Sequence, residues 1–202
     1  MSGRSWGDGY SRDVAGSLID YVWLESRAAH IRSYAAIVVP GLLQTAAYAE
    51  HVIHADEPEA TTEQIRRWYE LRMNRQRVME EPNAPQVTAI LDEAVLRRKV
   101  ASPDVTRDQL RHLVELAALP NVEIRVLPFE AGKLASVHGS FEIFQMPDPF
   151  PEVAYTESLA GGIYVEAPDI SRFTHAYDGH MAMALGSAES IEMIAAIAKD
   201  ER

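Results

Sequence analysis

Three residues in the second half of the sequence could carry out acid–base chemistry. His138 precedes Gly139 in a segment between two predicted strands, and a loop histidine titrates near neutral pH. Glu157 and Tyr164 occur on neighbouring predicted strands, where they could point the same way and act as base and acid. The simpler interpretation is structural: an exposed loop histidine, and a hydrogen-bonded core pair of Glu157 and Tyr164.

A second group of polar residues lies on the apolar face of a predicted helix. Thr61 and Gln64 have the spacing of a capping box, and the helix that they open carries Arg72 and Gln76 among its inward-facing residues. A buried guanidinium keeps its charge and therefore needs a carboxylate partner. The candidate carboxylates are Glu25, Glu93 and Glu157.

Two interpretations of Arg72 and Gln76 remain open. One is a structural ion-pair network that ties the helices to the sheet, in which we place Glu25, Glu93 and Arg97. The other is the wall of a pocket, because the arginine fork binds carboxylate or enolate oxygens through two parallel hydrogen bonds.

The elbow, which we define as residues 39–45, would form the facing wall of that pocket. It is apolar, turns at Pro40 and Gly41, and ends in the polar pair Gln44 and Thr45. We expect it to place Tyr34, Leu43 and Gln44 opposite Arg72 and Gln76. The expected substrate-binding residues are Tyr34, Leu43, Gln44, Arg72, Arg75, Gln76 and Phe141.

Other kinds of site find little support in the sequence. The chain has no cysteine, and the histidine pairs His51/His54 and His175/His180 lack the spacing and carboxylates of a metal site. There is no nucleophile-elbow motif, and Gly161–Gly162 lacks the lysine of a phosphate-binding loop. We therefore expect no metal and no cofactor.

Composition limits the class of protein further. The chain has 202 residues, 47% of them hydrophobic, which suffices for one sizeable core. A net charge of −11 repels phosphate backbones, so we expect no direct binding of nucleic acid. The absence of cysteine fits a cytoplasmic protein, and no apolar run predicts a membrane span or a signal peptide.

The elements that would position these residues predict an α+β fold, with N-terminal helices packed on a small mixed sheet and C-terminal helices. We expect a flexible lead-in over residues 1–13 and a single small-molecule-binding domain over 14–202, helical in 14–84 and sheet-containing in 85–202. The closing helices could form a homodimer face.

Predicted helices cover residues 14–33, 41–54, 61–80, 106–118, 167–185 and 187–199. A helical turn covers residues 92–98. Predicted strands cover residues 87–91, 122–127, 140–146, 153–158 and 163–165.

A set of short motifs occurs in one order along the chain: residues 21–28, 31–34, 39–45, 72–76, 91–98, 120–122, 126–132, 155–157 and 161–164. In this order they resemble the domain of unknown function that follows the helix-turn-helix in actinobacterial Xre-type, antitoxin-like regulators. The resemblance covers residues 6–196. It implies a DNA-reading domain upstream, and residues 1–13 are too short to supply three helices.

Two functions from different classes follow. The leading hypothesis is a regulator-derived domain acting as a cofactor-free enzyme. It would dehydrate, isomerise or cyclise a hydrophobic, oxygen-bearing, polyketide-like natural product. The alternative is the effector-sensing or partner-binding half of an antitoxin-like regulator.

Overall fold

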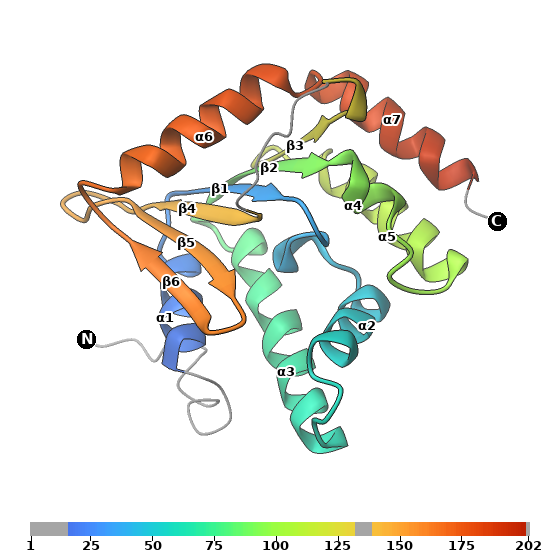
Figure 1. The fold of residues 1–202 in the computed structure, drawn as a ribbon, viewed down its shortest axis with the longest axis horizontal. Coiled ribbons are helices and arrows are strands. Elements are labelled where there is room, and N and C mark those ends of the chain that lie inside the picture. Colours follow the sequence, from blue (N-terminus) through green and yellow to red (C-terminus); the bar gives the residue numbers. More distant parts are fainter. Residues whose placement is uncertain (1–15, 132–138, 201–202) are drawn as a thin grey trace.

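A mixed sheet forms the centre of the protein. The computed structural model describes residues 16–131 and 139–200, and within them six strands pair in the order β3-β2-β1-β4-β5-β6. The pairs β3–β2 and β2–β1 are parallel, whereas β4, β5 and β6 are antiparallel to their neighbours (Figure 1). The strands are β1 His30–Ala35, β2 Gln86–Asp92, β3 Val122–Leu127, β4 Phe141–Gln145, β5 Val153–Ser158 and β6 Gly161–Val165.

Helices cover both faces of this sheet, which confirms the predicted α+β class. One face packs against α6, and the other carries the larger core, to which α1, α2, α5 and α7 contribute (Figure 1). The helices are α1 Gly16–Glu25, α2 Ala46–Asp56, α3 Thr62–Arg75, α4 Glu93–Arg97, α5 Pro103–Leu116, α6 Ile170–Met183 and α7 Ser187–Asp200. The described residues also contain three 3-10 turns: η2 Gly41–Leu43, η3 Gln76–Glu80 and η4 Phe129–Ala131.

The prediction of one helix over residues 14–33 is wrong, because residues 30–35 form strand β1. Helix α1 ends at Glu25, and β1 lies between β2 and β4 inside the sheet. A central strand is buried on both faces, so its apolar positions need not alternate cleanly, and Ile31 also fits the helical spacing of Leu24 and Ala28. The sheet therefore takes its central strand from the part of the chain predicted to be helical.

The elbow is a partly buried loop around the 3-10 turn η2, and three glutamine side chains hydrogen-bond its backbone groups. Gln44 donates to Val39 O (2.7 Å), and Gln76 donates to Gly41 O (3.0 Å) and Gln44 O (2.7 Å). Gln109, from α5, donates to the carbonyl of Leu43 and accepts from the amide of Thr45, both at 2.7 Å. A buried loop is stable only when its backbone groups find such partners.

In the sequence, Thr106 and Gln109 also have the spacing of a capping box, which predicts that a helix starts at Thr106. The structure corrects this prediction: α5 begins earlier, with Ser102 as the N-cap, so Thr106 is buried inside the helix and Gln109 binds the elbow instead. The capping box predicted at Thr61 and Gln64 is confirmed at the start of α3.

We expect Gln109→Ala to destabilise the protein by about 2–6 kcal/mol, because two backbone groups of the elbow lose their partner at about 1–3 kcal/mol each. Chemical denaturation measures this change in the free energy of unfolding. Gln86→Ala, at an exposed position of β2, is the matched control. Equal stability of the two variants would show that the glutamine contacts do not hold the elbow.

Candidate functional site

Four polar side chains form a row across one face of the sheet. Ser33, Glu142, Tyr155 and Tyr164 are paired in register on the adjacent strands β1, β4, β5 and β6. Cross-strand neighbours in register point to the same face, so these side chains lie side by side. We call these four residues the transverse row; Tyr21 of α1 packs on it.

Glu142 is the carboxylate of the transverse row, and Tyr21 is its hydrogen-bond donor. The Tyr21 hydroxyl donates to Glu142 Oε2, and the Tyr21 ring packs edge-on against Phe144 and Tyr155, at centroid distances of 5.4 and 4.8 Å. Burial raises the pKa of Glu142 to about 7, although the Tyr21 hydrogen bond opposes that rise. The nearby charge of Glu25 raises it further. This carboxyl group therefore changes charge near neutral pH.

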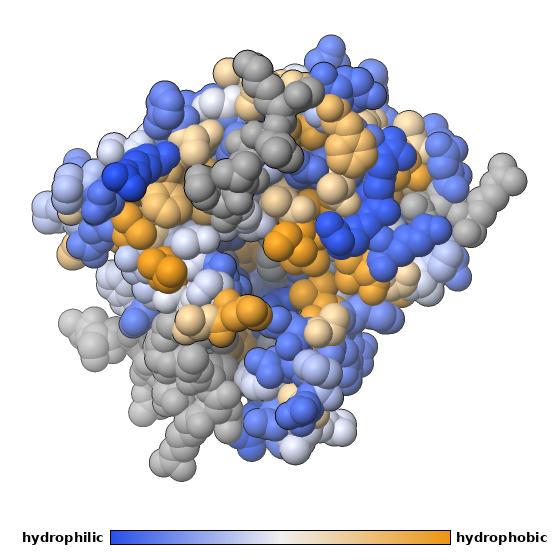
Figure 2. Space-filling view, viewed as in Figure 1, coloured by the Kyte–Doolittle hydropathy of each residue, from blue (hydrophilic) through white to orange (hydrophobic). Residues whose placement is uncertain are grey.

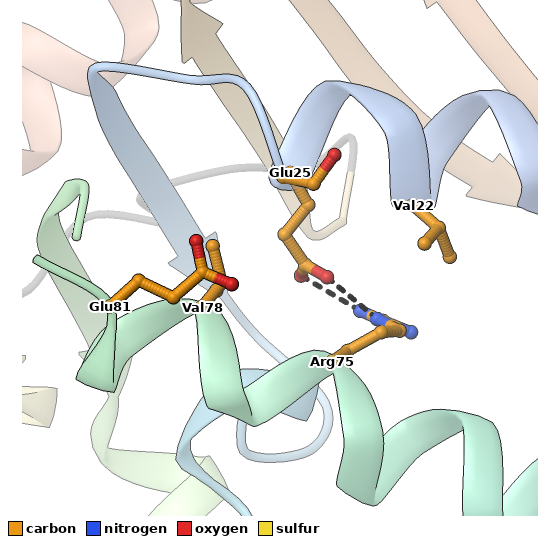
Figure 3. Close-up of a pocket in the computed structure, with 6 residues that line it drawn as sticks. Val22, Glu25, Arg75, Val78 and Glu81 are labelled. Atoms are coloured by element: carbon orange, nitrogen blue, oxygen red, sulfur yellow. Dashed lines mark hydrogen bonds and ion pairs between the residues drawn. The ribbon is translucent and has the colours of Figure 1, made fainter. Parts of the chain in front are cut away.

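A buried ion pair next to Tyr21 joins α1 to α3. Arg75 Nε and Nη2 donate to the two carboxylate oxygens of Glu25, at 2.7 and 2.9 Å (Figure 3). The guanidinium also lies over the Tyr21 ring, 4.7 Å from its centroid. Burial lowers the pKa of Arg75, but the facing carboxylate outweighs burial and raises it. The carboxylate of Glu25 thus supplies the counter-ion that the buried guanidinium needs.

The small cavity beside this pair has a volume of about 20 Å³, which is room for a single water molecule rather than a metabolite (Figure 3). Its lining residues are Val22, Glu25, Ser26, Arg75, Val78 and Glu81.

Tyr155 reaches its place in the row only because position 162 is glycine. A Cβ on Gly162 would lie 2.4 Å from Tyr155 Cε2 and 2.7 Å from its hydroxyl oxygen, closer than atoms can approach. The Tyr155 ring lies 5.0 Å from the Tyr164 ring, and its hydroxyl bonds to the side chain of the exposed Glu157. The hairpin of β5 and β6 thus brings two tyrosines and a carboxylate together.

Arg72, one turn before Arg75, contacts the elbow. Its Nη1 donates to Gln44 Oε1 at 3.2 Å, and among the described residues no carboxylate lies within ion-pair distance of it. Burial lowers the pKa of Arg72 to about 10, with the charge of Arg75 as the next cause. Tyr21 and the carboxylates of Asp56 and Glu157 oppose that shift, although neither carboxylate is within ion-pair distance.

The molecular surface is hollowed where these elements meet. Figure 2 shows a depression between the β5–β6 hairpin and the elbow, at the C-terminal part of α3, with apolar side chains on its flanks. The hollow lies on the side of the sheet that carries α1 and α3. We define the candidate site as the transverse row with Tyr21, Arg72, Gln44 and Glu157.

The structure brings together only part of the predicted site. Gln44 is buried and contacts Arg72 and Gln76, as expected from the elbow. Leu43 is fully buried in the larger core. The fully buried arginine is Arg75 rather than Arg72, because Leu71 and Arg75 form the inner stripe of α3.

Tyr34 and Phe141 depart from the expected arrangement. They are a register pair of β1 and β4 on the opposite face, in the smaller core under α6, so Tyr34 does not lie opposite Arg72. The Tyr34 hydroxyl donates to Asp92 (3.3 Å), and its ring lies 4.1 Å from that of His180. Strand alternation explains the difference, because Tyr34 sits one position after Ser33 of the row.

The remaining predicted residues have separate places. Glu93 is buried and accepts hydrogen bonds from Arg97 Nε (2.6 Å) and the Phe129 amide (2.8 Å), which fixes α4 to the turn after β3. His138 lies outside the described residues. Within the described ranges there is no cluster of three or more histidines and carboxylates that could hold a metal.

Sequence reasoning missed the two residues at the centre of the site, Tyr21 and Glu142. A glutamate inside the apolar run around Phe141 and Phe144 was the available signal, because a charged residue rarely occurs in a strand that is covered on both faces. The partner of Glu142 could not be found this way, since 121 positions separate it from Tyr21.

Comparison with known proteins places the chain in a family. Residues 18–196 match the family described as a domain of unknown function, DUF5753, and the chain therefore belongs to it. No curated protein and no solved structure matches the chain. Of the helices that the structure describes, none taken singly has both the length and the apolar character that crossing a membrane requires.

We expect Glu25→Gln to destabilise the protein by about 3–5 kcal/mol, because Arg75 then keeps a buried charge without its counter-ion. Replacing both residues, in Glu25→Gln/Arg75→Met, should cost less than the sum of the two single changes. Denaturant unfolding of all four proteins gives the coupling energy. Glu63→Gln, in an exposed helix pair, is the control and should change little. Additive effects of Glu25 and Arg75 would contradict the pairing.

Proposed function

We propose that the candidate site binds a small hydrophobic, oxygen-bearing molecule and performs acid–base chemistry on it without a metal or nucleotide cofactor. The observation that carries this proposal is the contact between Tyr21 and Glu142 on the transverse row, beside two further tyrosine hydroxyls. A proton donor and a proton acceptor in hydrogen-bond contact, on rigid elements, are what such chemistry needs.

Glu142 has the features of a group that exchanges protons near neutral pH. Its carboxyl is held on a strand between two others, so it cannot easily turn towards bulk water. In the protonated form it can give a proton to a departing hydroxyl of the substrate, and the resulting carboxylate can take the proton from the neighbouring carbon. This sequence eliminates water with protons balanced and leaves the enzyme unchanged.

The surroundings of Glu142 favour a substrate with both apolar and oxygen-bearing parts. Aromatic rings of Tyr21, Tyr155 and Tyr164 offer apolar surface, and the hydroxyl oxygens of Tyr21 and Tyr155, whose protons go to Glu142 and Glu157, can accept a hydrogen bond from a substrate hydroxyl. A polyketide-like intermediate has this composition. Dehydration, isomerisation and ring closure of such molecules need orientation and proton transfer only.

A second candidate is an effector-sensing or partner-binding domain of an Xre-type, antitoxin-like regulator. The elbow favours it, since Gln44 contacts Arg72 at the site while Gln109 ties the same elbow to α5. A ligand that moved Arg72 would thus also displace the elbow, which Gln109 connects to α5. An in-frame helix-turn-helix encoded upstream, or an adjacent gene for a small partner protein, would support this function.

Deletion of the gene from a producing strain tests the enzymatic proposal. We expect an intermediate to accumulate, and purified wild-type protein to convert it without added metal or nucleotide. Glu142→Gln should lower the rate by about 10²–10⁴-fold, the usual contribution of a general acid or base. Glu192→Gln, at an exposed position on α7, should leave it unchanged. An unaltered metabolite profile with altered transcript levels would contradict the enzyme and favour the regulator.

A further inference from the structure

Arg72 carries a positive charge that the described residues leave without a counter-ion. Its neighbour Arg75 is neutralised by Glu25 through two hydrogen bonds, whereas Arg72 donates to the neutral amide oxygen of Gln44. Two arginines one turn apart repel each other, and burial removes part of the water that would screen them. An anion bound at Arg72 would reduce the repulsion between the two arginines and would replace the lost water as a partner of the guanidinium.

The guanidinium is held in position and still open on one side. Gln44 is buried, and its amide donates to Val39 O while its oxygen accepts from Arg72 Nη1. None of the nitrogens of Arg72 is among the buried atoms that lack a partner in the described part of the chain, so those without a hydrogen bond reach solvent. A preorganised arginine whose remaining donors reach solvent is suited to bind a planar anion.

We infer that the ligand of the candidate site carries one anionic oxygen group, a carboxylate or an enolate, which Arg72 binds while the apolar part of the ligand extends to the transverse row. This inference deepens the proposed function and rests on it. Tyr21 lies between the two ends, because its ring contacts the guanidinium of Arg75, one turn from Arg72, and its hydroxyl donates to Glu142.

The charges around the site select for a single negative charge. Glu157 and Glu142 stand near the same space, on adjacent strands, and the whole chain has a net charge of −11. A dianion such as a phosphate monoester would meet these carboxylates with only one unpaired arginine to balance them. A carboxylate needs only the two parallel hydrogen bonds of one guanidinium.

Binding of octanoate, with octanamide as its neutral analogue, tests the inference. Isothermal titration calorimetry at a pH where octanoate is ionised should show octanoate binding more tightly than octanamide. Arg72→Gln should weaken octanoate binding by at least about tenfold, the loss expected for a charge-assisted hydrogen bond, without changing octanamide binding. Arg72→Lys, which keeps the charge but not the fork, should fall between. Arg66→Gln, on the exposed side of the same helix, is the control.

The outcomes separate this inference from the proposed function. Equal affinity for octanoate and octanamide, or octanoate affinity unchanged in Arg72→Gln, overturns the anion site. No binding of octanoate to the wild type overturns it as well. In each case the rate test with Glu142→Gln still decides the acid–base function, because that test does not depend on Arg72. A thermal melting curve of each variant confirms that it is folded.

Discussion

The ion pair of Arg75 and Glu25 is the constraint on which the rest of the structure depends. A guanidinium cannot lose its proton inside a protein, so its burial is tolerable only with a carboxylate in bidentate contact. That requirement fixes α1 against the end of α3. The guanidinium also packs beside the elbow, since Nη2 lies 3.4 Å from where a Cβ of Gly41 would be. The face of Arg75 then supports the Tyr21 ring.

Neutralising Arg75 with Glu25 has a consequence for the second carboxylate. Glu142 meets Tyr21, a neutral hydroxyl, and the nearest arginine is already paired. Its charge is therefore poorly compensated, and burial raises its pKa to about 7. Helix α1 thus contributes two residues with different roles. Glu25 neutralises Arg75, and Tyr21 gives Glu142 a neutral partner, so that the Glu142 carboxyl group can exchange its proton. The structural network and the candidate chemistry share Tyr21.

Local signals predicted much of this fold, and long-range partners account for what was missed. The capping box at Thr61 located α3, and alternation in residues 122–127 located β3. Strand β1 was missed because its identity comes from pairing with β2 and β4, not from its own periodicity. The sequence showed that an arginine of the third helix needs a carboxylate, but which arginine meets it depends on how α3 is rotated against α1. Tyr34 was assigned to the wrong face of the sheet, because neighbouring residues of a strand point to opposite faces and β1 had not been recognised as a strand.

Titration of Glu142 in the folded protein tests this account most directly. Carbon-13 NMR of labelled glutamate side chains follows its carboxyl signal with pH, and Glu142→Gln identifies that signal. The account predicts a midpoint near the pKa of about 7, so Glu142 is protonated below this pH and ionised above it. Because the ordinary value is 4.5, folding then becomes less favourable as pH rises between these two values. A midpoint at the ordinary value of 4.5 would show that Glu142 is ionised at neutral pH and would contradict its role as a proton donor.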